Sequence, residues 1–230
     1  MNDINDLVIK QEVGKLHRWK TWEPNTPFAP SLDVSFYIDN LQSSIVDDLL
    51  SLIRTNNLGS YDDDAWKTYN IFSYASASVK TLSNFIWSMY SQYCDQLQVE
   101  SLSKDQIWIR GWAIKLENDQ GLKMHSHSLH ENTFLSGNIS LTQNNTTTDY
   151  WIPLFSLYHG PFMCENIPGK ICLFPSWVQH GVNPNQSGAV RYSVGFDMFT
   201  EHTMNYIHEN RIENSEIQNT ILLSKKFSDI

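Results

Sequence analysis

The sequence lacks both a cysteine framework and any long hydrophobic run. Its three cysteines, Cys94, Cys164 and Cys172, are odd in number and have neither disulfide nor zinc-finger spacing, which indicates a reducing compartment. No stretch approaches the roughly 20 apolar residues that a membrane-spanning helix needs. The first residues carry neither the basic cluster nor the apolar run of a signal peptide. These absences predict a cytoplasmic protein with no membrane association.

Positive charge is also scarce, with 16 Lys and Arg against 25 Asp and Glu and a formal net charge of −9. Nucleic-acid-binding surfaces gain most of their affinity by neutralising phosphates, so this balance argues against a nucleic-acid partner. The hydrophobic fraction of 41% and the charged fraction of 18% are those of a globular chain rather than a disordered one. A chain of 230 residues is long enough for one well-buried domain.

The N-terminal half of the chain reads as an arm followed by helices. Three prolines break regular structure within residues 1–30, which we expect to form an irregular arm. Residues 31–106 are predicted to be a helical support that opens with a strand at Asp33–Ile38. A capping-box pattern at Ser44 and Asp47 predicts the start of a first helix, and apolar residues at spacings of three and four predict a second at Ser78–Leu97. We expect both helices to pack on the outside of a sheet.

From Ile107 onward the apolar pattern changes to a period of two, which is typical of strands. The predicted strands are Ile107–Leu116, Phe134–Leu141, Tyr150–Leu157, Lys170–Phe174 and Val190–Phe199. The polar segment Gln143–Asp149 is expected to be an exposed loop, and Gly160–Pro168 a longer connection. Helices followed by strands predict an α+β, mainly β domain whose sheets form a sandwich or barrel. We expect a single domain over residues 1–230, with its β core at 107–199 and a C-terminal tail at 200–230.

Histidines gather at one place in this β-rich half. Three of the eight, His125, His127 and His130, lie within six residues. A single histidine is usually a surface or core residue, and chance clustering is the simple alternative. Residues i and i+2 of a strand point to the same side, so His125 and His127 can face one point, which His180 can reach from a distant strand. Imidazole binds iron, zinc, copper or nickel, and three facial ligands leave positions open for a co-substrate and O₂, as non-haem iron oxygenases require.

The same half resembles a family of 2-oxoglutarate/Fe(II)-dependent oxygenases known from phages and marine bacteria. The similar segments, spread over roughly residues 107–198, are Gly111-Trp112 before the His-x-His pair, Leu135-Ser136-Gly137, Gly169, Leu173–Trp177, His180 and Arg191–Ser193. The resemblance implies a double-stranded β-helix, or jelly roll, to which the apolar spacing adds two N-terminal helices on the outside of a sheet. It also implies Fe(II) and 2-oxoglutarate as cofactors, O₂ as co-substrate and a dioxygenase that acts as a hydroxylase.

Three positions depart from the pattern of that family. The usual acid of its His-x-Asp/Glu pair is His127 here, so the third ligand stays open. His127 itself completes a three-histidine site in one arrangement, while Glu131 or His130 replaces it in the others. The tyrosines that commonly follow Ser-Gly are Ile139 and Ser140.

Arg191 and Ser193 follow His180 and share one face of their predicted strand. A guanidinium in a cleft offers a bidentate fork to the distal carboxylate of 2-oxoglutarate, with the serine hydroxyl as a further donor. The alternative is a surface arginine at the start of a strand. The order His, Arg, x, Ser favours the role in binding the oxo-acid.

Two other functions compete with the oxygenase. Cupins have a similar pattern of His125, His127, Glu131 and His180 around one metal, and they include isomerases and oxygenases that use no oxo-acid. Such a site would not require an arginine at position 191. The third reading is a metal-free β-sandwich that serves as a binding or structural module. Peptides, nucleobases, lipids and small metabolites are all left open as the primary substrate.

Overall fold

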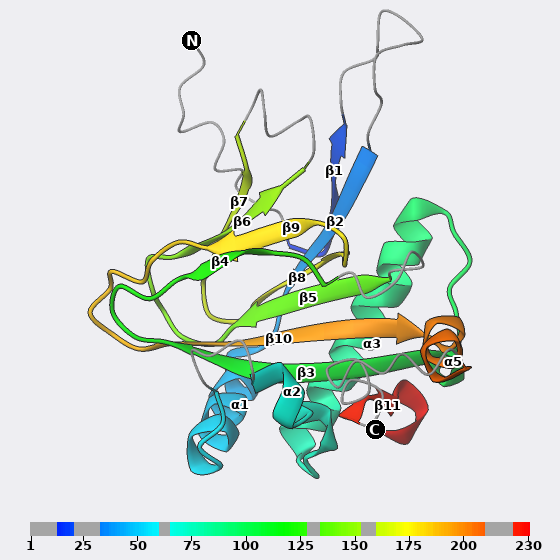
Figure 1. Ribbon diagram of the computed structural model, residues 1–230, viewed down its shortest axis with the longest axis horizontal. Coiled ribbons are helices and arrows are strands. Elements are labelled where there is room, and N and C mark those ends of the chain that lie inside the picture. The colour runs from blue at the N-terminus through cyan, green and yellow to red at the C-terminus, as the bar shows by residue number, and fades with distance from the viewer. Residues whose placement is uncertain (1–12, 21–32, 60–64, 128–133, 153–159, 210–222) are drawn as a thin grey trace, which may run out of the picture.

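Two antiparallel sheets face each other in the computed structural model, which describes residues 13–20, 33–59, 65–127, 134–152, 160–209 and 223–230 (Figure 1). Along the large sheet the strands run β1 (Lys15–Lys20), β2 (Asp33–Asn40), β8 (Lys170–Pro175), β5 (Leu135–Ser140), β10 (Arg191–Thr200), β3 (Ile107–Leu116) and β11 (Lys225–Lys226). Along the small sheet they run β4 (Leu122–His125), β9 (Gln179–Val182), β6 (Thr147–Trp151) and β7 (Phe162–Glu165).

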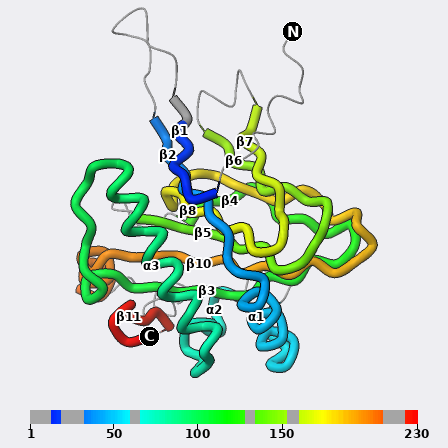
Figure 2. Tube along the Cα trace, turned by 180° about the vertical axis from the view of Figure 1, so that it is seen from behind, coloured from blue at the N-terminus to red at the C-terminus, as the bar shows by residue number. Residues whose placement is uncertain are grey.

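The helices α1 (Ser43–Thr55) and α3 (Ala77–Leu97) cover the outer face of the large sheet, away from the small sheet (Figures 1 and 2). The other helices are α2 (Ala65–Thr68) and α5 (Glu201–Glu209), with the short 3-10 turns η2 (Ile71–Ser73), η3 (Lys104–Gln106) and η4 (Phe227–Asp229). The apolar sides of α1 and α3 share one buried cluster with outward-facing residues of the sheet. Both helices predicted from the sequence, and their place outside a sheet, are confirmed. No helix in the described ranges is long and apolar enough to cross a membrane.

Strand β10 lies in the middle of the large sheet and is buried along almost its whole length. Because side chains alternate across a strand, its even-numbered residues Val194, Phe196 and Met198 join the cluster under the helices. Its odd-numbered residues therefore face the small sheet, and three of them are polar: Arg191, Ser193 and Asp197. The alternation thus places a row of polar and charged side chains between two packed sheets.

Steric constraints explain why two positions in the segments that resemble the oxygenase family are glycine. Gly137 lies in β5 opposite Phe196 of β10, and a Cβ at this position would lie only 2.7 Å from Cε1 of the Phe196 ring. Gly169 precedes β8 with a φ of +86°, a backbone conformation that residues other than glycine rarely adopt. Its backbone N–H donates to Ser140 and its carbonyl accepts from Leu41, so this turn joins β5 and β8 to the start of α1.

Some elements differ from the prediction. Five strands, β1, β4, β7, β9 and β11, were not among the predicted ones, and β1 lies within the segment expected to be an irregular arm. The segment Gln143–Asp149 is not a fully exposed loop, because its second half enters β6 and Thr146 and Thr148 are buried. The capping box at Ser44 is also wrong, since α1 starts at Ser43 with Gln42 as an N-cap that makes no side-chain hydrogen bond. Pro24, Pro27 and Pro30 lie outside the described residues.

One buried side chain ties the segment before η2 to the sheet. Asn70 donates to the carbonyls of Ile109 (3.1 Å) and Leu223 (2.7 Å) and accepts from the N–H groups of Phe72 (3.1 Å) and Gly111 (3.0 Å). These four bonds use the full hydrogen-bonding capacity of an asparagine amide. The side chain therefore connects η2, β3 and the C-terminal segment.

The substitution Asn70→Ala should destabilise the fold strongly, because it leaves buried backbone groups of three segments without partners. Each such group costs about 1–3 kcal/mol, so the free energy of unfolding should fall by at least about 2 kcal/mol. Urea unfolding followed by circular dichroism measures this loss. The control is Asn56→Ala at the exposed end of α1, whose side chain bonds one carbonyl, and a similar loss in both variants would contradict the role of Asn70.

Candidate metal centre

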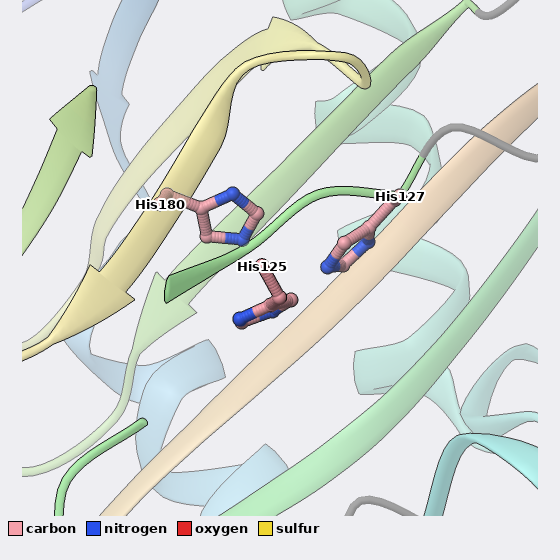
Figure 3. Close-up of side chains that lie close together, drawn as sticks. All are labelled: His125, His127 and His180. Atoms are coloured by element: carbon pink, nitrogen blue, oxygen red, sulfur yellow. The ribbon is translucent and has the colours of Figure 1, made fainter. Parts of the chain in front are cut away.

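Three histidines converge at the mouth between the two sheets (Figure 3). His125 ends β4 and lies directly opposite His180 of β9, and His127 follows two residues after the end of β4. One ring nitrogen from each lies within 4.8 Å of the others. The ring centroids are 4.5 Å apart for His125 and His180, 4.9 Å for His127 and His180, and 5.1 Å for His125 and His127. The antiparallel β4–β9 pair thus unites residues far apart in the sequence.

Each of the three rings is oriented by a hydrogen bond at Nδ1. The acceptor is the carbonyl of Lys123 for His125 (2.7 Å), the carbonyl of Val178 for His180 (3.1 Å) and a carboxylate oxygen of Asp197 for His127 (2.6 Å). Carbonyl and carboxylate oxygens only accept, so the proton lies on Nδ1 and the lone pair on Nε2. This arrangement is the usual one for metal-binding histidines, in which the second nitrogen fixes the tautomer and the ring orientation.

The environment keeps His180 neutral. Its ring is buried beside Phe174, with ring centroids 4.8 Å apart. Burial, and then the nearby rings of His127 and His125, hold the pKa of His180 well below its ordinary value. A metal binds the neutral form of imidazole, so this site does not need to lose a proton from His180 before binding at neutral pH.

A buried guanidinium lies deeper between the sheets. The side chain of Arg191 is only 2% exposed, and its Nη1 donates to Ser193 Oγ at 3.0 Å. Its Nε has no hydrogen-bond partner, and no carboxylate pairs with it in the described part of the chain. Burial lowers the pKa of Arg191 to about 10, which leaves the group charged at neutral pH. The positive charge of this buried guanidinium is therefore not compensated by an acid among the described residues. An anionic ligand would compensate it.

Further polar groups surround this guanidinium. Ser140 lies directly opposite Ser193 in the β5–β10 pair, and its buried hydroxyl has no hydrogen-bond partner among the described residues. Tyr150 lies opposite His180 in the β6–β9 pair and accepts a hydrogen bond from Asn138 at 3.1 Å. Burial raises the pKa of Tyr150 well above its ordinary value, so its hydroxyl keeps its proton. Tyr150 thus lies next to His180, with ring centroids 5.9 Å apart, and interacts electrostatically with Arg191.

The sequence prediction named part of this site. His125, His127 and His180 come together, and Arg191 and Ser193 share the inner face of β10. His130 and Glu131, the alternative third ligands, lie outside the described residues. The prediction missed a second set of inward-facing groups, namely Asn138, Ser140, Tyr150 and Asp197. An acid at position 197 within the apolar run of β10 was a readable signal, because it shares the odd-numbered face with Arg191.

Comparisons with known proteins agree with this geometry. Residues 158–197, which include His180, Arg191 and Ser193, match the family described as "Putative 2OG-Fe(II) oxygenase". A search of curated proteins gave no significant match. The matched segment holds β7, β8, β9 and most of β10, so it contains His180 and Arg191 but not His125 or His127.

Solved structures share the fold at low sequence identity. A Pseudomonas putida prolyl-4-hydroxylase has a TM-score of 0.55 at 12% identity over 72% of this chain and 92% of that one. A Trichoplax adhaerens prolyl hydroxylase has 0.55 at 15% over 73% and 84%, and the epimerase SnoN from nogalamycin biosynthesis has 0.54 at 10% over 72% and 77%. These likenesses confirm the predicted double-stranded β-helix. Residues 158–197 thus match a family of 2-oxoglutarate- and Fe(II)-dependent oxygenases, and the chain shares its fold with the two hydroxylases and the epimerase named above.

Proposed function

We propose that the protein is an Fe(II)- and 2-oxoglutarate-dependent hydroxylase with a three-histidine iron site. His125, His127 and His180 would hold the metal, and Arg191 with Ser193 would hold the distal carboxylate of the oxo-acid. The observation that carries the proposal is the pairing of two incomplete sites: convergent histidine nitrogens and a buried guanidinium that pairs with no carboxylate among the described residues. An oxo-acid with a carboxylate at its far end could bind the metal at the histidines with one end and Arg191 with the other.

The three histidines fit a divalent metal such as Fe(II). Imidazole nitrogen is a good ligand for iron, and the Nδ1 hydrogen bonds aim the lone pairs of the three rings towards one region. Three protein ligands leave coordination positions for a co-substrate and O₂. When bound together, Fe(II) and 2-oxoglutarate supply oxidising chemistry, in which O₂ converts the oxo-acid to succinate and CO₂ and hydroxylates a second substrate.

The residues between the histidines and Arg191 would bind and orient the oxo-acid and exclude water from it. Arg191 offers a charged donor to the distal carboxylate, and the hydroxyls of Ser140, Ser193 and Tyr150 offer further donors. An apolar cluster that includes Phe36, Phe162 and Phe174 fills the space between the sheets beyond Tyr150. Because this end is packed with rings, a ligand that reaches Arg191 leaves the bulk solvent, and its charge–charge contact is stronger than it would be in water.

Arg191 also favours the oxygenase over the cupin reading. A metal site without an oxo-acid has no use for a buried cation, and burying one without a partner costs several kcal/mol. The structure keeps that cation buried on β10, an interior strand of the large sheet that lies between β5 and β3. The need for an anion at this position therefore supports an oxo-acid co-substrate.

The first test concerns the metal. The variants His125→Ala and His180→Ala should each lose stoichiometric binding of Fe(II), because two ligands hold a divalent ion far less tightly than three. Isothermal titration under anaerobic conditions measures the stoichiometry and affinity, and circular dichroism checks the fold. His208→Ala, at an exposed position of α5, is the control and should bind as the wild type does. Wild-type affinity in either site variant would remove the proposed centre.

The second test concerns the co-substrate. Arg191→Ala should bind 2-oxoglutarate roughly 10- to 150-fold more weakly, since a hydrogen bond to a charged group is worth about 1.5–3 kcal/mol. Arg191→Lys should recover part of the affinity, because an ammonium lacks the planar fork. The measurement titrates the Fe(II)-loaded, oxygen-free protein with 2-oxoglutarate and follows the charge-transfer absorption.

Two controls accompany that titration. Fe(II) affinity should be unchanged in Arg191→Ala, and Arg54→Ala at the exposed end of α1 should bind the oxo-acid normally. Equal binding by wild type and Arg191→Ala would reject Arg191 as the anchor but keep the reaction class. A wild-type protein that binds no 2-oxoglutarate and forms no succinate in air would reject the hydroxylase itself.

A further inference from the structure

The ligand set proposed above contains no negative charge. In the resembling family the residue two positions after the first histidine is an acid that binds the metal directly, whereas here it is His127. Three neutral imidazoles leave the two positive charges of the metal without compensation from the protein ligands. The charge must therefore come from the oxo-acid alone or from a group outside the ligand set.

Asp197 lies where such a group would act. Its carboxylate accepts a hydrogen bond from His127 Nδ1 at 2.6 Å, and the two side chains are 12% and 13% exposed. Asp197 belongs to the inward-facing row of β10 and comes from the far side of the His127 ring relative to Nε2. A negative charge at Nδ1 increases the electron density that the ring can donate through Nε2.

A cluster of serines fixes the position of this carboxylate. Ser136 Oγ donates to Asp197 Oδ1 at 2.6 Å and lies 2.9 Å from Ser176 Oγ. The backbone of Ser176 in turn accepts a hydrogen bond from the N–H of His127 at 2.9 Å. The main chain and the ring of His127 are thus tied to one buried cluster, which limits the orientation of Nε2.

On its other side Asp197 has a buried cation. Arg110 is its direct partner in the β3–β10 pair and is only 1% exposed, with its guanidinium carbon 5.0 Å above the ring of Trp66. The carboxylate thus stands in a row that runs from Arg110 through Asp197 to His127. Asp197 can therefore also act in a purely structural role, in which its charge compensates that of Arg110 and stabilises the sheet.

We propose that Asp197 is a positioning residue for the metal, which orients His127 through Nδ1 and supplies from behind the ring the charge that an acidic ligand would supply directly. The inference rests on the proposed function, because it requires a metal at the three histidines. It differs from a purely structural role in one respect. A carboxylate that acts through His127 changes metal affinity, whereas one that only neutralises Arg110 changes the stability of the fold.

The experiment compares Asp197→Ala and Asp197→Asn with the wild-type protein, using Fe(II) and the air-stable ions Co(II) and Ni(II) as probes. Outer partners of metal-bound histidines contribute roughly 10- to 100-fold to metal affinity, so Asp197→Ala should bind each ion weaker by this factor. Asp197→Asn keeps an oxygen acceptor but no charge and should lie between the two. Asp149→Asn, a carboxylate of β6 that accepts from the Thr147 hydroxyl, is the matched control and should bind normally.

A double-mutant cycle shows whether the effect passes through His127. In the His127→Ala background the ring between carboxylate and metal is absent, so adding Asp197→Asn should change the remaining Ni(II) affinity by less than about threefold. An equal loss in both backgrounds would mean that Asp197 does not act through His127. Thermal melting of the metal-free variants gives the separate readout of fold stability.

The outcomes separate the inference from the function on which it rests. If the wild type binds no metal at a stoichiometry of one, the three-histidine site fails and the role of Asp197 falls with it. If the wild type binds metal and both Asp197 variants bind equally well, only the inference is overturned. A lower melting temperature with unchanged metal affinity assigns Asp197 to the sheet rather than to the site.

Discussion

A charge enclosed between two packed sheets loses its hydration, and only a partner of opposite sign or a set of aimed dipoles recovers that free energy. Three such groups, Arg110, Arg191 and Asp197, lie on the inner face of the central β3–β10 pair. Arg110 and Asp197 are opposite each other, and Asp197 also reaches His127. Arg191 has a serine hydroxyl but no acid among the described residues. The inside of the sandwich is therefore balanced at one end and short of an anion at the other.

This imbalance couples the two ligands of the proposed site. A dianionic oxo-acid would bring one carboxylate to Arg191 and its other, metal-binding end to the histidines. Its charge would then compensate the guanidinium and the metal at the same time. Binding of either ligand should accordingly strengthen binding of the other, since coupling between two sites is reciprocal. If the three histidines are the metal ligands, the lack of an acid among them would make this mutual dependence stronger than in a site with a carboxylate ligand.

The sequence predicted the parts of the fold that carry a clear apolar period. The bounds of Ile107–Leu116 agree with those of β3, and the second helix differs from α3 by one residue at its start. The short strands β4, β7 and β9 have four residues each, too few to establish alternation, and β1 mixes Lys, His and Arg with few apolar residues. These strands exist because a neighbouring strand completes their hydrogen bonds, which is information that a local pattern does not contain.

The site shows the same division. Histidines are rare enough that His125, His127 and His180 stood out from their spacing, and Arg191 with Ser193 followed from the strand period. Ser140, Asn138 and Tyr150 are ordinary residues in a mainly β chain, and only the register of β5 with β10 and of β6 with β9 brings them to the proposed site. Asp197 could have been found from the parity of β10, whereas its contact with His127 depends on how β4 crosses above that strand. The division of the chain into arm, support, core and tail stays a prediction.

The order of strands in the large sheet also determines at which stage of folding the proposed site can form. Apart from β1 and β2, the strands that pair in this sheet are far from each other in the chain, and β10 must enter between β5 and β3. Non-local pairings of this kind form slowly, because the entropy of closing long loops is lost before the contacts are gained. Arg191 takes its place in the large sheet only after these pairings are complete. If the proposed site binds metal and oxo-acid together, a growing chain would have no complete site until β10 has been made, and binding of both ligands would mark a finished fold.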